Sequence, residues 1–226
     1  MIYEYQDAPS AYPTITSAGA ENLIGWGALS GMTYADGKVY AVNDSFYSYQ
    51  PTIFQIDATQ TPAKIEKAIP VTRAGRPAQK LDMEGIVADG DGGFWIASEG
   101  RTDRVVPHAL YHVNDKGAIK EEIGLPAELM AVEKRYGFEG ITKIGNTLWM
   151  AVQREWADDE KGMVKLVAYN LETEEWGAMH YPLDKGAEGW VGHRPWRAGQ
   201  KGLRRRRSLG FLPYAPHQWI AGVPSE

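Results

Sequence analysis

Acidic side chains occupy the same place in two similar segments of the sequence. Glu84 precedes Gly85 and Glu139 precedes Gly140, and an isoleucine follows each glycine. Carboxylates that gather in partly dry surroundings repel one another, so they require a cation, shared protons or arginine partners. The chain has no cysteine, and oxygen ligands alone suit a hard cation such as Ca²⁺ or Mg²⁺. The sequence therefore predicts a site for Ca²⁺ or another hard divalent cation.

Three chemical roles are predicted for residues of this kind. A dication would polarise an attacking water, one carboxylate would act as general base, and nearby cationic or amide groups would hold anionic oxygens. The predicted metal ligands are Asp44, Asp82, Glu84 and Glu139. The predicted catalytic residues are Glu84, Glu99 and Glu139. The predicted substrate-binding residues are Arg101, Arg154, Asn43 and Gln153.

A repeated hairpin pattern is the element that would position these residues. Each repeat has a short strand-like run entered through glycine, a Gly, Asn or Asp turn, and a second run that carries an aromatic residue. The repeated glycines are Gly31, Gly85 and Gly140, which lie 54 and 55 residues apart. Further strand-like runs follow each hairpin, at 52–56, 109–113 and 164–169.

Four strands in each repeat are typical of a β-propeller blade, so we expect an all-β fold of the β-propeller class. The alternative is an all-β sandwich whose hairpins resemble one another by chance. Since propellers have four to eight blades, the three repeats predict an incomplete propeller with about three to four blades present. We expect the propeller part to span residues 1–192.

Equivalent positions of different blades meet near the propeller axis, which would bring the acids together. The second strands of the three repeats end in Asn43-Asp44, Ser98-Glu99 and Gln153-Arg154. Strand alternation places Asp82 and Glu84 on one side. We therefore expect Asp44, Asp82, Glu84, Glu99 and Glu139 to converge. The alternative is that these acids are structural and bond backbone N–H groups that lock the blades together.

The segments Asp82-Met83-Glu84-Gly85-Ile86, Ser98-Glu99-Gly100 and Gly137-Phe138-Glu139-Gly140-Ile141 resemble the family called esterase-like activity of phytase, or phytase-like domain. The resemblance covers roughly residues 25–190. It implies a β-propeller, usually in exported bacterial proteins, with hydrolytic activity on phosphate or carboxylic esters. Propeller phytases with a calcium-filled acidic funnel are a more distant likeness.

Two functions follow as hypotheses. The first is a metal-assisted hydrolase that acts on a small anionic or ester substrate through the acidic centre of the propeller. The second is a non-catalytic propeller that binds a ligand or a protein partner and uses its acids structurally. Neither the substrate nor the oligomeric state can be predicted from these residues.

Charge is distributed unevenly along the chain. The net charge is −5, while residues 193–226 contain seven Lys and Arg and a single acid. An acidic body repels phosphate backbones, so no nucleic-acid partner is expected. Residues 193–226 are predicted to be a basic tail that is disordered or non-native, with a basic arm for nucleic acid or acidic lipids as the alternative. No apolar run is long enough to span a membrane. The first residues lack a signal-peptide pattern, so export is implied by the resemblance alone.

Overall fold

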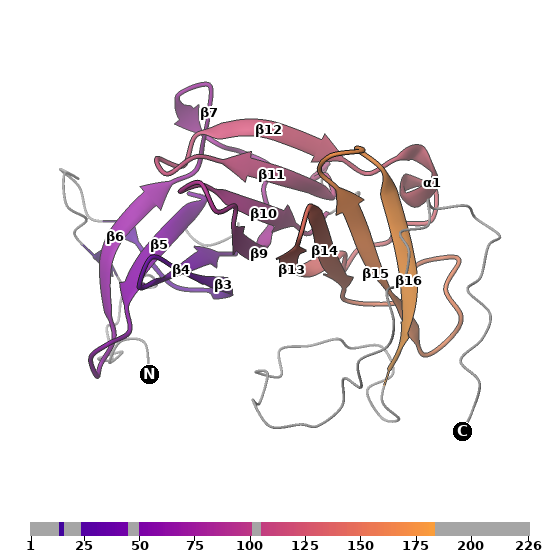
Figure 1. Cartoon of the computed structure of the whole chain (residues 1–226), viewed down its shortest axis with the longest axis horizontal. Helices are drawn as coiled ribbons and strands as arrows, with labels where there is room; N and C mark the ends of the chain where they lie inside the picture. Colours follow the sequence, from indigo (N-terminus) through magenta and orange to yellow (C-terminus); the bar gives the residue numbers. More distant parts are fainter. Residues whose placement is uncertain (1–13, 16–23, 45–49, 101–104, 184–226) are drawn as a thin grey trace.

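Three four-stranded antiparallel sheets form most of the chain in the computed structural model, which describes residues 14–15, 24–44, 50–100 and 105–183. Each sheet is a meander in which strands adjacent in sequence pair with one another. Figure 1 shows the three sheets following one another along an arc. The predicted all-β class is confirmed.

The strands of the three sheets, in chain order, have the following bounds. The first sheet contains β3 (Leu29–Ala35), β4 (Lys38–Asn43), β5 (Thr52–Asp57) and β6 (Lys64–Pro70). The second contains β9 (Met83–Ala88), β10 (Phe94–Ser98), β11 (Ala109–Val113) and β12 (Ile119–Gly124). The third contains β13 (Phe138–Ile144), β14 (Thr147–Val152), β15 (Met163–Asn170) and β16 (Trp176–Pro182). The strand-like runs predicted after each hairpin are confirmed as β5, β11 and β15.

Short elements lie around these sheets. Two two-stranded sheets pair β1 (Thr14–Ile15) with β2 (Ile24–Gly25), and β7 (Thr72–Arg73) with β8 (Arg76–Pro77). The short helix α1 (Ala127–Met130) precedes β13. Among the residues that the structure describes, no helix is long and apolar enough to cross a membrane.

Turn chemistry accounts for the first hairpin. Ala35 pairs with Lys38, so Asp36 and Gly37 form a two-residue loop, with φ of +49° and +77°. Two successive positive φ angles match the twist of the flanking strands, and Asp-Gly is a favoured pair for such a turn. The local sequence thus sets the register of β3 against β4.

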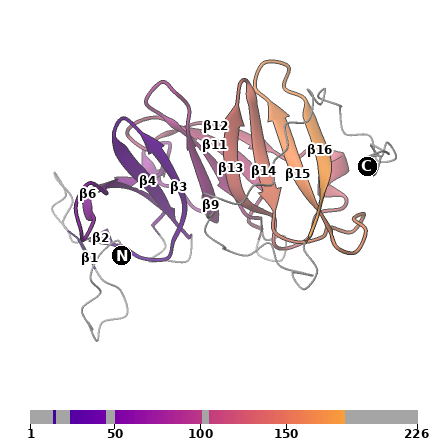
Figure 2. The ribbon, with the colours of Figure 1, turned by 60° about the horizontal axis from the view of Figure 1, so that its bottom comes forward.

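The first strands of the three sheets lie on the concave side of the arc, and the fourth strands lie on the outside (Figures 1 and 2). On the concave side, the backbones of neighbouring first strands lie in direct contact. A Cβ placed on Gly31 would lie 2.6 Å from the Cα of Gly85, and one placed on Gly85 would lie 3.0 Å from the Cα of Gly140. Gly31 and Gly85 therefore allow β3, β9 and β13 to pack in direct contact, because a side chain at either position would meet the backbone of the next blade.

Hydrophobic cores fill the spaces between neighbouring sheets. One cluster joins Val42 and Ile53 of the first sheet to Ile86 and Ile96 of the second. A second cluster joins the second and third sheets, and it contains Trp95, Leu110, Leu148, Met150 and Val167. Burial of these side chains at each junction fixes the sheets relative to one another.

Meandering sheets with their first strands innermost have the arrangement of propeller blades, although the described residues do not form a closed ring. The sandwich alternative does not fit this arrangement, because sandwich sheets would stack as two layers. That these sheets belong to a β-propeller, of which about three to four blades are present, stays a prediction. The predicted tail, residues 193–226, lies outside the described residues, and so does the predicted domain boundary at 192.

Candidate functional site

A β-bulge interrupts the first strand of every blade at the same place. In the second blade Met83 pairs with Ser98 and Gly85 with Ala97, so Glu84 is the extra residue. In the third blade Phe138 pairs with Val152 and Gly140 with Ala151, so Glu139 is the extra residue.

The first blade has the corresponding shift between Leu29 and Met32, where Ser30 precedes the repeated glycine. Bulges leave a residue out of the ladder and re-aim its side chain, often beside a functional site. The residue before each repeated glycine is thus outside the strand pairing, and its side chain can take part in a functional site.

A second set of equivalent residues follows the second strand of each blade. In each blade, the residue directly after the second strand donates its backbone N–H to a backbone carbonyl near the start of the first strand. The acceptor lies two residues before the bulge position. The three bonds are Asp44 to Ala28 (2.9 Å), Glu99 to Asp82 (2.7 Å) and Gln153 to Gly137 (2.8 Å). Gln153, and not Arg154, is therefore the equivalent of Asp44 and Glu99, which corrects the alignment of strand ends made from the sequence.

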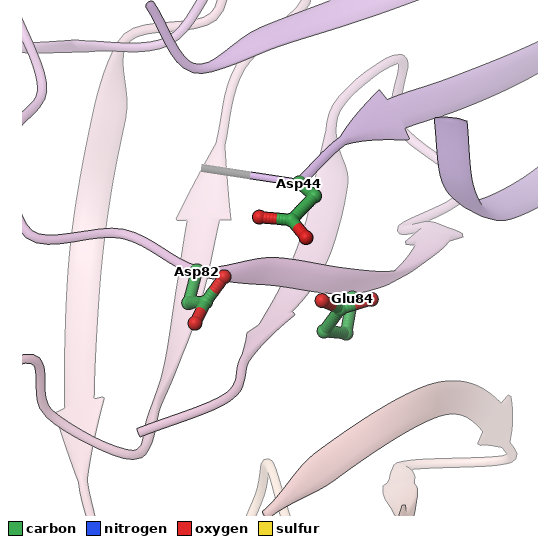
Figure 3. Close-up of side chains that lie close together, drawn as sticks. All are labelled: Asp44, Asp82 and Glu84. Carbon is green, nitrogen blue, oxygen red and sulfur yellow. The ribbon is translucent and has the colours of Figure 1, made fainter. Parts of the chain in front are cut away.

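Three carboxylates from two blades form the closest group of the site. Asp44 follows β4, Asp82 precedes β9, and Glu84 is the bulge residue of β9 (Figure 3). One oxygen of each lies within 4.8 Å of the others. Asp82 and Glu84 are buried and Asp44 is half-buried.

Each glutamate at a bulge position accepts a hydrogen bond from a neutral side chain. The hydroxyl of Ser30 donates to the carboxylate of Glu84 in the next blade. The amide nitrogen of Gln153 donates to the carboxylate of Glu139 within the third blade. Hydrogen bonds from neutral donors hold both carboxylates in place without neutralising them.

Burial and neighbouring charges alter the acidity of Glu84. Loss of hydration raises its pKa, the hydrogen bond from Ser30 lowers it, and the charges of Glu139, Asp44 and Asp82 raise it further, to about 8. Desolvation and like charges both penalise the ionised form. Glu84 therefore holds a proton near neutral pH until a positive charge displaces it.

The pKa of Glu99 is raised for similar reasons. Burial is the main cause that raises its pKa, the charges of Glu139, Asp82 and Asp44 add to it, and Arg135 opposes them, with a result of about 7. Its Oε1 atom is buried and meets no hydrogen-bond donor among the described residues. Asp44, Asp82 and Glu139 thus act electrostatically on both Glu84 and Glu99, which links the five predicted acids.

The predicted substrate-binding residues lie in different settings. Asn43 is buried, and its side chain accepts a bond from the backbone N–H of Thr52 (2.8 Å) and donates to the carbonyl of Gln50 (3.2 Å). Arg154 lies over the ring of Tyr136, 4.0 Å from its guanidinium carbon to the ring centre. Arg101 lies outside the described residues.

Neither Ser30 nor Arg135 was among the predicted metal-binding, catalytic or substrate-binding residues, although Ser30 was expected to face the centre as a hydrogen-bonding group. Ser30 occupies the repeat position before the glycine, so its alignment with Glu84 and Glu139 was the available signal. Arg135 lies over the same Tyr136 ring at 4.8 Å, and it counters the acids at Glu99. No repeat or motif marks Arg135 in the sequence. Tyr136 itself adopts a φ of +74°, an unfavourable conformation for a bulky residue.

The donor set fits a hard divalent cation. Its members are oxygen atoms from three carboxylates, and the charge of a fourth acid, Glu139, also acts on Glu84. Ca²⁺ takes several carboxylate and carbonyl oxygens in a flexible arrangement, whereas Mg²⁺ requires near-octahedral geometry. Clustered carboxylates repel one another when no cation is bound, so binding of a divalent cation stabilises them strongly.

The raised acid pKa values predict a pH-dependent stability for the cation-free protein. Because Glu84 and Glu99 titrate at about 8 and 7 in the fold, above the usual 4.5, the folded state holds protons that the unfolded chain has released. This contribution is fully present below about pH 4.5 and is lost as the pH rises through 7 and 8. Urea unfolding in chelator should lose on the order of 3 kcal/mol between pH 6 and pH 9. A free energy of unfolding that rises over this range would contradict the assignment.

Comparison with known proteins gives one family. The sequence model of the phytase-like family, described as esterase-like activity of phytase, matches residues 24–200. No curated protein sequence matches the chain. The match includes every described residue of the three four-stranded sheets and of the acidic group.

Proposed function

Because the chain belongs to the phytase-like family, whose description suggests a hydrolase-like function, we propose that it hydrolyses phosphate or carboxylic esters with the help of a divalent cation. Asp44, Asp82 and Glu84 would hold the cation, with Glu139 beside them. Ca²⁺ is the favoured ion, since the donors are carboxylates on two different blades. Family membership also favours an exported protein.

The observation that carries this proposal is the gathering of three carboxylates, two of them buried, at a place where the inner strands are bulged. A buried acidic group without a cation is unfavourable, as the raised pKa values of Glu84 and Glu99 indicate. A purely structural role would leave such acids bonded to backbone donors. Glu99 instead has a buried oxygen with no donor in the described part of the chain.

Each residue would contribute a distinct step. A bound dication supplies Lewis-acid polarisation of the ester oxygen and favours ionisation of an attacking water. Glu99, with a pKa of about 7, suits proton transfer at neutral pH. Gln153 and Ser30 fix the carboxylates of Glu139 and Glu84. Arg154 and Arg135 would bind anionic oxygens of the substrate.

Hydrolysis assays on the full chain test the proposal. With p-nitrophenyl phosphate and p-nitrophenyl acetate as substrates, we expect turnover in Ca²⁺ and its loss in chelator. Asp82→Asn should reduce Ca²⁺-dependent turnover by about 10²-fold, because a buried ligand charge is lost.

Asp91→Asn is the matched control, since Asp91 is exposed in the turn between β9 and β10. Equal turnover of the wild type and both variants, or turnover indifferent to chelator, would reject the cation-assisted mechanism. No turnover of either substrate, with Ca²⁺ binding intact, would favour the ligand-binding alternative.

A further inference from the structure

His108 contacts both of the blades that supply Glu99 and Glu139. It immediately precedes β11, and its side chain is buried, with 6% of the residue exposed. Its ring is packed edge-on against Phe138 and Trp156, at 6.3 and 5.7 Å between ring centres. The ring therefore occupies the junction between the second and third blades.

Two glycines leave the space that this ring fills. A Cβ on Gly100 would lie 2.0 Å from the ring, and one on Gly137 would lie 2.1 Å from its Nδ1 atom. Gly100 follows Glu99, and Gly137 lies two residues before Glu139. The backbone segments that carry these two acids therefore lie against the same imidazole.

Hydrogen bonds orient the imidazole. The backbone N–H of Gly100 donates to Nδ1 at 3.0 Å, so Nδ1 is an acceptor. Nε2 then carries the ring proton and donates to the carboxylate of Glu133, 2.7 Å away. Burial lowers the pKa of His108 although the charge of Glu133 opposes this, which agrees with a neutral ring. One tautomer is thus defined by two partners.

We propose that His108 is a positioning residue that sets the placement of Glu99 relative to Glu139 across the junction of the two blades. No sheet hydrogen bonds join these blades, since β9–β12 and β13–β16 are separate sheets. Among the charges that act on the Glu99 carboxylate, that of Glu139 has the largest effect. The hydrogen bond to Glu133 orients the imidazole, and the imidazole accepts the backbone N–H of Gly100. The backbone of Gly100 in turn positions the neighbouring residue, Glu99. The expected effect of His108 on Ca²⁺ binding rests on the proposed function. The contacts of His108 with Gly100 and Glu133 do not depend on it.

Removal of a hydrogen bond to a metal ligand commonly lowers the metal affinity by 10–100-fold, and His108 would act less directly, through the backbone next to Glu99. We therefore expect His108→Phe, which keeps an aromatic ring but loses both bonds, to weaken Ca²⁺ binding by about tenfold in isothermal titration calorimetry of the full chain. His112→Phe is the matched control. His112 lies four residues further along, within β11, and it pairs with Asp89 at 2.8 Å and stacks on Trp95. Its removal should leave the Ca²⁺ affinity unchanged.

Two smaller substitutions separate positioning from simple packing. His108→Asn offers an oxygen near the place of Nδ1 and can keep the bond from Gly100, whereas His108→Gln reaches toward Glu133 and loses that bond. We expect Asn to restore most of the affinity that Phe loses, and Gln to restore little. If affinity instead follows thermal stability across all four variants, His108 only fills space and the proposal is overturned.

A cation-free measurement keeps this test separate from the proposed function. In chelator, the side-chain carboxyl ¹³C resonances of Glu99 and Glu139 should shift in His108→Phe and stay in place in His112→Phe. If the wild type binds no Ca²⁺ but these resonances shift as expected, the proposed function fails and the positioning role stands. Unchanged resonances in His108→Phe would overturn the positioning role whatever the protein binds.

Discussion

Glu84→Gln is expected to stabilise the cation-free protein at pH 9 and to abolish its stabilisation by Ca²⁺. Glu84 is buried and titrates at about 8, so at pH 9 the fold carries an ionised group in unfavourable surroundings. Glutamine removes the charge and still offers an oxygen to the Ser30 hydroxyl. We expect a gain of roughly 2 kcal/mol in the free energy of unfolding, measured by urea titration in chelator.

The same substitution should reverse its effect when Ca²⁺ is present. Because Glu84 supplies one of three clustered carboxylates, its loss should weaken Ca²⁺ binding roughly 10²-fold. A ligand that binds only the folded state stabilises it in proportion to the logarithm of its concentration over Kd. The wild type should therefore gain stability with added Ca²⁺, while the variant gains little at the same concentration.

Glu128→Gln provides the control for this pair of effects, since Glu128 is exposed on α1. It should change neither the unfolding free energy at pH 9 nor the response to Ca²⁺. A Glu84→Gln variant that is destabilised at pH 9 in chelator would show that the carboxylate is needed for folding. That outcome would support structural acids over a cation site.

Gly85→Ala should be among the most destabilising single substitutions in this chain. An added Cβ would lie 2.8 Å from the backbone nitrogen of Ile141 and 3.0 Å from the Cα of Gly140. Backbone atoms of a paired strand cannot move aside without disturbing the ladder. We expect a loss of about 2–4 kcal/mol in the free energy of unfolding, with a lower urea midpoint and an unchanged slope.

Gly140→Ala is the matched control at the equivalent position of the next blade. Among the described residues, nothing lies within 4 Å of a Cβ placed there. Alanine should therefore change the stability by less than about 1 kcal/mol, with a gain from the less flexible unfolded chain in its favour. An equal loss at both positions would mean that Gly85 matters for a reason other than its contact with β13.

The repeat could be identified from the sequence because each hairpin combines turn residues with strand-forming residues. Asp36-Gly37 defined one turn, and the glycines at 31, 85 and 140 gave the spacing of the blades. What these glycines do in space could not be inferred from spacing alone. Their role depends on contact between strands of different sheets, a tertiary property that no local pattern encodes.

Convergence of the acids was predicted, and in the described structure Asp44, Asp82 and Glu139 act on both Glu84 and Glu99. Three of the acids, Asp44, Asp82 and Glu84, form the closest group. The reasoning was incomplete, since strand alternation was used to place Asp82 beside Glu84. Glu84 is in fact the extra residue of a bulge, where alternation does not hold. A bulge depends on the register between strands, so it was not visible in the strand residues.

Other parts of the site left no pattern in the sequence. His108 and Glu133 are 25 residues apart, and Glu133 belongs to the connection between the second and third blades. Arg135 precedes a residue with a left-handed backbone and belongs to no repeat. Side chains supplied by connections between blades vary from one connection to the next, so repetition gives no guide to them.

The bulges separate the architecture of each blade from the side chain that it presents. Since the residue before each glycine is outside the pairing ladder, the three blades can present Ser30, Glu84 and Glu139 on nearly the same backbone. Exchanges at these places would alter the charge of the centre while the surrounding strands keep their partners. A scaffold built in this way can acquire a new reaction through a handful of substitutions, with its folding largely untouched.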